Sequence, residues 1–72
     1  MVVALKSRAI KKKLARKNKS QNWFAYKLGV SSGYMSQLMS GIRNPSPDLR
    51  EKILTELKMD VSGFDKVFEI KD

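Results

Sequence analysis

The residues of this chain that could do chemistry are mostly hydroxyls, amides and lysines, and these types do not suit catalysis. The sequence contains no histidine and no cysteine, and residues 1–47 contain no carboxylate that could form an acid–base pair. Serine and lysine alone give no activated nucleophile, which needs an adjacent base or a lowered pKa. We therefore expect no enzyme activity, no cofactor and no metal site.

A group of small, uncharged polar residues recurs within residues 32–40 at spacings that place it on one side of a helix. The group consists of Ser32, Gly33, Ser36, Gln37 and Ser40. Met35 and Leu38 supply the apolar side of the same helix. A helix face that is merely solvated is normally rich in Lys and Glu, whereas this face carries no charge. It is therefore a candidate binding surface, and the alternative is the wet side of a helical hairpin.

Residues 20–41 have the spacing of a helix-turn-helix, which would position this face. Ser20 is expected to cap a first helix, because its hydroxyl can accept from the free N–H groups of the first turn. Gly29 can adopt the left-handed conformation that ends this helix, and Ser31 can cap the second. The crossing of two such helices needs a residue as small as Ala25 at the closest approach.

Charge is distributed unevenly along the chain. Residues 1–47 contain ten Lys and Arg and no acid (+10), whereas residues 48–72 contain five basic and seven acidic residues (−2), which gives the net charge of +8. An acid-free basic segment that includes the helix-turn-helix is typical of a polyanion-binding surface. The alternative, that lysines merely keep a small domain soluble, predicts interspersed acids.

The length of 72 residues allows one domain with a small core, because a chain of this size buries only about 60% of its unfolded surface. No apolar run approaches the ~20 residues of a membrane span. The absence of cysteine removes disulfides and thiolate metal sites. We expect a cytoplasmic protein with no membrane partner and no small-molecule ligand.

Apolar spacing predicts further helices on both sides of the motif. A first amphipathic helix is expected over about residues 3–17. A helix after the motif is expected to follow Ser46 and Pro47, which suit the N-cap and the first helical position, and to end near Leu57.

A short fifth helix is expected after Ser62, which with Asp65 resembles a capping box. No credible strand is found, and residues 69–72 are expected to form a tail. The predicted fold is an all-α, compact bundle of about five short helices in a single domain, residues 1–72.

The sequence resembles the phage-repressor and Cro family of helix-turn-helix regulators, often called the Xre family. The resemblance covers about residues 10–57 and rests on S-Q-x-x-F-A-x-x-L-G-V-S, on Y-M-S-Q-L followed by Gly41, and on R-N-P-S-P. It implies a lambda-repressor-like DNA-binding domain whose helix 32–40 enters the major groove. The implied function is that of a sequence-specific double-stranded DNA-binding transcriptional regulator, a Cro-like repressor of a phage or other mobile element, associated with the nucleoid through its operator.

The resemblance also implies particular DNA contacts. It places Ser32, Gly33, Ser36 and Gln37 at base-facing positions. It places phosphate contacts at Gln21, Ser40, Arg43 and Asn44. Further candidates for phosphate contact, from their charge or polarity, are Lys19, Lys27 and Tyr34, although solvation explains the two lysines equally well.

The base-facing positions differ in what they can read. Gln37 can pair bidentately with the N6 and N7 edge of adenine, while Ser32 and Ser36 specify bases weakly. Gly33 has no side chain to read with. Its missing Cβ could permit close approach to the DNA backbone, or Gly33 could be a tolerated poor helix former.

Two features depart from the family pattern. Leu14 and Met39 stand where many members carry a buried Arg–Glu ion pair, and because both have changed together we expect the two side chains to touch in the core. Trp23 stands at a position that is usually polar. It either covers the first helix or serves as an exposed anchor for a partner.

Other functions remain open on the sequence. An antitoxin-like or adaptor protein-interaction module could use Trp23, Phe64 and Phe68 as a protein-binding patch. Nonspecific binding of a basic helix to RNA or membranes would leave Ala25 and Gly29 unexplained. The sequence does not choose between a monomer and a homodimer on DNA.

Overall fold

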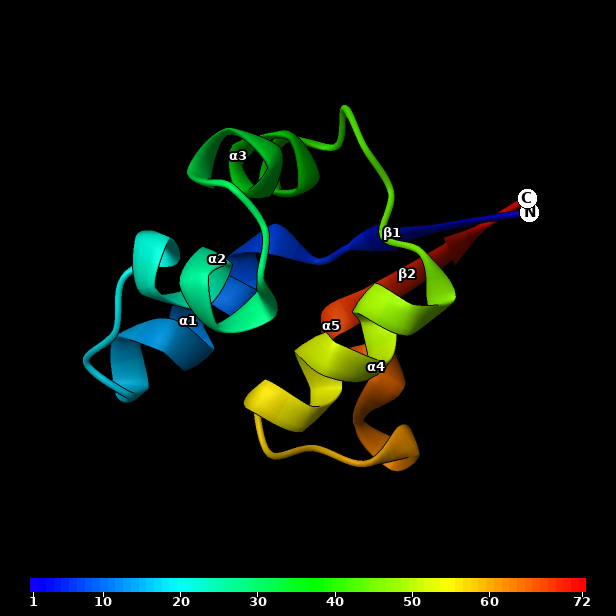
Figure 1. Cartoon of the computed structure of the whole chain (residues 1–72). Coiled ribbons are helices and arrows are strands. Elements are labelled where there is room, and N and C mark those ends of the chain that lie inside the picture. Colours follow the sequence, from blue (N-terminus) through cyan, green and yellow to red (C-terminus); the bar gives the residue numbers. More distant parts are fainter.

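Five α-helices and a two-stranded β-ribbon make up the computed structural model, which describes all of residues 1–72 (Figure 1). The fold is mostly helical. In chain order the elements are β1 (Val2–Leu5), α1 (Ser7–Arg16), α2 (Gln21–Leu28), α3 (Ser32–Ser40), α4 (Pro47–Glu56), the 3-10 turn η1 (Val61–Gly63), α5 (Phe64–Val67) and β2 (Phe68–Lys71).

The two strands correct the prediction of an all-α chain. β1 and β2 pair antiparallel, with Val2 opposite Lys71 and Leu5 opposite Phe68. Residues expected to begin the first helix and to form a tail at 69–72 therefore pair with each other instead. The β-branched run at the start of the chain favours a strand only once a partner strand is available. Figure 1 shows the two chain ends side by side at the tip of this ribbon, which projects from the helices.

The core consists of one cluster to which every α-helix and strand β2 contribute. Its twelve buried residues are Ile10, Leu14, Phe24, Ala25, Leu28, Met35, Leu38, Leu49, Ile53, Leu57, Val67 and Phe68. Met35 and Leu38, the predicted apolar side of the helix at 32–40, are confirmed as buried. Leu49 and Ile53 of α4 are also buried, whereas Leu54 is only partly buried. Phe68 reaches the core from a strand rather than from the predicted fifth helix.

The segment from α2 to α3 has the boundaries that its capping residues predict. Ser20 and Ser31 each accept a hydrogen bond of 3.0 Å from the backbone N–H three residues further on. Gly29 has a φ of 76° and ends α2, and the Val30 N–H donates to the Ala25 carbonyl at 3.0 Å. Ala25 is 2% exposed, and α2 packs directly on α3.

The C-terminal third follows the sequence prediction only in part. Ser46 caps α4 as expected, by accepting from the Leu49 N–H at 3.2 Å, and Pro47 occupies the first turn. The predicted capping box at Ser62 is wrong. Asp60 instead accepts from the Ser62 hydroxyl and from the Ser62 N–H, and these bonds lower the pKa of the Asp60 carboxyl.

Candidate nucleic-acid interface

The outward side of α3 is exposed because the opposite side is anchored in the core by Met35 and Leu38. The exposed residues of this side are Ser32, Gly33, Ser36 and Ser40, while Gln37 is half-buried. Outside the chain neighbours of Gly33 and the adjacent backbone of its own helix, a Cβ built on Gly33 would meet nothing closer than the Ser31 hydroxyl oxygen, at 4.0 Å. Nothing inside the protein therefore requires glycine at this position.

The loop that follows α3 folds back onto it through Arg43. The Arg43 Nε donates to the side-chain oxygen of Gln37, and the Arg43 backbone N–H donates to the Gln37 carbonyl at 3.2 Å. The guanidinium lies over the Tyr34 ring, 5.2 Å from its centroid. The Ser40 hydroxyl donates to the same Gln37 carbonyl at 3.2 Å. Four of the predicted site residues thus form one cluster.

This cluster presents hydrogen-bond donors. Gln37 has one side-chain oxygen and one NH₂ group, and the oxygen already accepts from Arg43. Arg43 has donors only. A ligand at this point therefore meets N–H groups from both side chains, which suits an acceptor-rich surface.

A second contact joins the start of α2 to α3. The Gln21 Nε2 donates to the Ser36 hydroxyl at 3.3 Å. Gln21 is the first residue of α2, where backbone N–H groups lack partners within the helix and favour an anion. One residue predicted for phosphate contact and one predicted for base contact are therefore adjacent.

Trp23 of α2 lies between Lys19, which precedes the helix, and Lys27. The Lys19 Nζ is 5.2 Å from the centre of its ring system, and the Lys27 Nζ is 6.0 Å away, both within the range of a cation–π interaction. Trp23 is half-buried and packs against the core, which agrees better with a covering role than with an exposed anchor. The four-residue spacing of the three residues was a usable signal that sequence reasoning missed.

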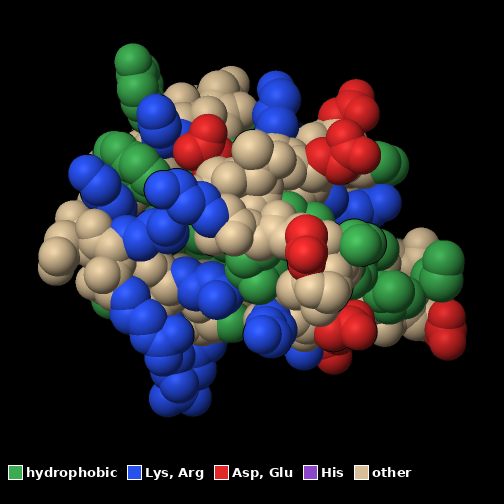
Figure 2. All heavy atoms as spheres, turned by 90° about the horizontal axis from the view of Figure 1, so that it is seen from below, with side chains coloured by type: hydrophobic (Ala, Val, Ile, Leu, Met, Phe, Trp, Pro, Cys, Tyr) green, Lys and Arg blue, Asp and Glu red, His purple; other side chains and the backbone are tan.

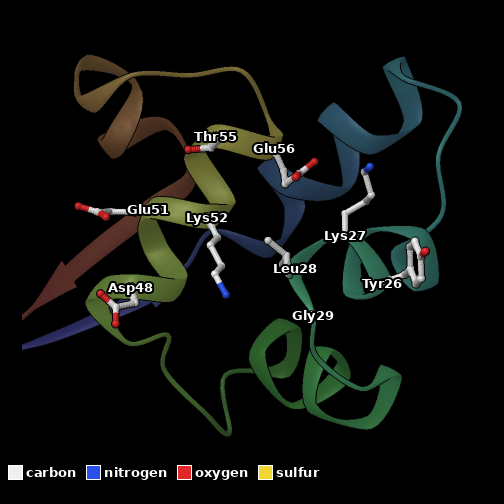
Figure 3. A pocket seen from close by; sticks show the side chains of 9 residues that line it. All are labelled: Tyr26, Lys27, Leu28, Gly29, Asp48, Glu51, Lys52, Thr55 and Glu56. Atoms are coloured by element: carbon white, nitrogen blue, oxygen red, sulfur yellow. The ribbon is translucent and has the colours of Figure 1, made fainter.

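Lys27 also borders an open groove between α2 and α4, of about 650 Å³ (Figure 3). Figure 3 shows its side chain directed away from α3. The α4 side of the groove carries the carboxylates Asp48, Glu51 and Glu56. These acids repel phosphate, so they mark one limit of any surface that binds a polyanion.

The basic charge of the chain does not form one patch around α3. Figure 2 shows the face turned away from α3, on which Lys and Arg side chains gather toward the end opposite the β-ribbon. The helix α1 supplies exposed basic residues in the order Arg8, Lys11, Lys12 and Arg16. Near α3 itself the cation is Arg43. Lys19 precedes α2, whose first residue Gln21 contacts Ser36 of α3.

The remaining predicted site residues make no side-chain hydrogen bond within the protein. Ser32 is exposed at the first turn of α3, and Asn44 is exposed in the loop that leads to α4. Both are free to bind a ligand.

Groups of acidic or metal-ligating side chains that could hold a metal ion are absent from the structure. None of its helices combines the length and the apolar character that crossing a membrane requires. No protein-family model, curated protein or solved structure matches the chain. The function must therefore be inferred from the surface described above.

Proposed function

We propose that this protein is a helix-turn-helix regulator that binds double-stranded DNA in a sequence-specific manner, with α3 in the major groove. The observation that carries the proposal is the uncharged polar side of α3, held outward and bordered by Arg43 and Gln21. Three residues connect α2 to α3, and Ala25 permits their close packing, as this motif requires. The width of the B-DNA major groove, about 12 Å, admits such a helix.

The donor cluster suggests which base pair is read. A glutamine side chain without another hydrogen-bond partner reads adenine, because its oxygen accepts from N6 while its NH₂ donates to N7. The oxygen of Gln37 already accepts one hydrogen bond from Arg43, so only one of its two lone pairs is free and donors outnumber acceptors in this pair. Guanine presents two acceptors, N7 and O6, at its major-groove edge. We therefore expect Gln37 and Arg43 to favour a G·C pair over an A·T pair.

Phosphate contacts in this proposal come from the two ends of the motif. Gln21 and the free N–H groups at the start of α2 would bind one phosphate, with Lys19 beside them. Ser40, Arg43 and Asn44 would approach the other strand from the loop after α3. The basic residues of α1, which lie further away, would attract DNA at long range rather than by contact.

The proposed regulatory action is repression. A domain that occupies an operator blocks other proteins from the same DNA, and this requires no further activity of the chain. We propose a Cro-like repressor of this kind, acting in the cytoplasm on DNA of the nucleoid.

The alternative of an antitoxin-like or adaptor module has no observation in its favour. Phe68 is 1% exposed and its ring lies 4.8 Å from the Phe64 ring, so this pair is largely committed to the core. Trp23 is packed between its lysines. Trp23 and Phe64 are only half-buried, so the patch on which that alternative depends is reduced to the exposed parts of these two rings.

Selection of binding sites from random double-stranded DNA tests the proposal. We expect enrichment of a short motif by the natural chain and loss of that enrichment in a matched variant, Gln37→Ala with Arg43→Ala, that keeps the same fold. Failure of the natural chain to enrich any sequence, with the protein folded, would contradict sequence-specific DNA binding.

A further inference from the structure

The outward side of α1 carries cations that have no acidic partner within the protein. These exposed residues, called the α1 surface below, are Arg8, Lys11, Lys12 and Arg16. The one ion pair of the structure joins Lys71 to Glu69 in β2. Folding therefore leaves the charges of the α1 surface to solvent or to a ligand.

The arrangement of these charges costs α1 stability. Arg8 lies in the first turn, where the positive end of the helix dipole disfavours a cation. Arg8, Lys12 and Arg16 follow one another at intervals of four residues, and like charges at this spacing destabilise a helix. The helix contains no acid that could offset the repulsion. A helix face that is merely solvated mixes charges of both signs, so solubility does not explain this pattern.

The surroundings of α1 do not neutralise its charge. α2 and α5 pack on α1. α2 contributes no acid, and α5 contributes one acid and one base, Asp65 and Lys66. Figure 2 looks at the face turned away from α3, and Lys and Arg side chains gather there at the end where Figure 1 shows α1. The α1 surface is therefore separate from the DNA surface proposed for α3.

The row of cations on α1 suits the backbone of a nucleic-acid duplex. At a rise of about 1.5 Å per residue, Arg8 to Arg16 span roughly 12 Å. B-DNA carries one phosphate per ~3.4 Å along each strand, so about three or four phosphates of one strand can face this row. We propose that the α1 surface binds the phosphate backbone of a second DNA duplex while α3 holds the first. One copy of the protein then bridges two segments of DNA.

Other anionic partners would need groups that the α1 surface lacks. Binding to a lipid surface needs large apolar side chains beside the cations. Ile10 and Leu14 are buried in the core, and the exposed apolar residue of α1 is the small Ala15. Single strands bind by stacking their bases on aromatic side chains, and α1 has none. The backbone of a duplex needs only cations along it.

The inference rests on the proposed function for the first duplex only. A single short operator seated on α3 lies away from the α1 surface, so these cations attract it at long range. The second duplex meets them directly. Binding there is independent of sequence, because contacts to phosphate carry no base information.

A bridging assay with the whole protein tests the inference. The selected operator duplex is fixed to a bead, a labelled duplex of scrambled sequence is free, and the protein is limiting. We expect the natural protein to retain the labelled duplex. Lys12→Gln with Arg16→Gln should lower this retention on the order of tenfold and make its salt slope shallower by about 1.8, because two phosphate contacts are lost.

Lys52→Gln with Lys71→Gln is the matched control. It also removes two charges from exposed positions, but these lie in α4 and β2, so retention should be nearly unchanged. Equal losses in the two double variants would overturn the inference, because bridging would then depend on net charge alone. Full retention by the α1 variant would also overturn it, since two copies could then bridge through α3.

The variant Gln37→Ala with Arg43→Ala separates this inference from the proposed function. It should lose preference for the operator and still bind scrambled duplex through the α1 surface. If no operator can be selected, the two double variants are compared on scrambled duplex alone, with the same expected difference. Displacement of that duplex by single strands or anionic vesicles more effectively than by unlabelled duplex, at equal phosphate concentration, would overturn the inference.

Lys12→Glu provides a measurement that loss of folding does not affect. The change replaces two repulsive pairs with attractive ones, to Arg8 and Arg16, so the thermal midpoint should rise by a few degrees while bridging is lost. A lower midpoint would show that the cations do not destabilise α1, and would remove the case for a ligand. Bridging that persists in this variant would overturn the inference directly.

Discussion

The side-chain oxygen of Gln37 accepts a hydrogen bond from Arg43 Nε, across six residues and from a loop to the middle of α3. Arg43 is itself held by the face of Tyr34. A residue expected to read bases and one expected to bind phosphate are thus a single unit. If α3 binds DNA as proposed, this contact would orient Gln37 in advance and so reduce the entropy lost on binding.

Substitution of this pair should reveal the coupling. Gln37→Ala should lose roughly 1–3 kcal/mol on the selected operator and relax preference at one base pair, with little change on scrambled DNA. Arg43→Ala removes a charge and should weaken binding to all DNA, and because it also frees Gln37 it should relax the same base pair. Binding titrations of the two variants and their double on both DNAs measure the coupling free energy, expected at roughly 0.5–3 kcal/mol.

The preferred base provides a sharper check on the same pair. In the natural protein we expect G·C at the position that Gln37 reads. In Arg43→Ala the oxygen of Gln37 is released, and preference should move toward A·T. Additive losses with no change of base would mean that the hydrogen bond between Gln37 and Arg43 does not persist on DNA.

The affinity for DNA should fall steeply with salt. If each copy neutralises about four phosphates, the slope of log K against log salt should be near −3.6. Arg43→Ala should make this slope shallower by about one unit. Lys12→Ala on α1 is the matched control, because Lys12 lies outside the proposed contacts and should change the slope less. A slope close to zero for the natural protein would remove the DNA proposal.

The local elements around the candidate site could be predicted because their signals lie within a few residues of each other. Ser20, Gly29 and Ser31 set the ends of α2 and α3, and each acts through backbone groups next to it. The ribbon could not be predicted in the same way. Val3 and Ile70 are 67 residues apart in the chain, and neither segment has a turn or an alternating pattern that specifies the other.

The contacts among side chains also could not be predicted from the sequence. The bond between Arg43 and Gln37 depends on how an irregular loop returns to α3, which no periodicity describes. The prediction that the acid-free basic segment forms one polyanion-binding surface was limited for a related reason. The acid-free segment wraps around the molecule, so much of its basic charge lies on the face turned away from α3.

Leu14 and Met39 should prove to be neighbours in the core. Leu14 is buried, Met39 packs against the same cluster, and the Ser7 hydroxyl ties α1 to the Met39 carbonyl. Leu14→Arg should destabilise the fold by roughly 3–5 kcal/mol because it buries a charge without a partner. Met39→Glu should cost less, since this side chain is half-buried and can reach water. Denaturant melts should show recovery in the double variant, and additive losses would mean that the two side chains do not meet.

The last prediction compares two glycines that have different backbone conformations. Gly29 has a φ of 76°, so Gly29→Ala should lower the free energy of unfolding by about 1 kcal/mol or more. Gly33 is helical with open space around it, so Gly33→Ala should raise that free energy by about 0.5–1 kcal/mol. Thermal or denaturant melts measure both changes.

DNA binding by Gly33→Ala then decides why glycine stands there. If the missing Cβ permits close approach of α3 to DNA, this variant should be more stable and yet bind the operator on the order of tenfold more weakly, because the added methyl meets the groove. Thr55→Ala is the control, since Thr55 is an exposed helical residue of α4 outside the proposed DNA surface. Unchanged affinity in Gly33→Ala would identify Gly33 as a tolerated poor helix former, and would leave Ser36, Gln37 and Arg43 to carry the specificity.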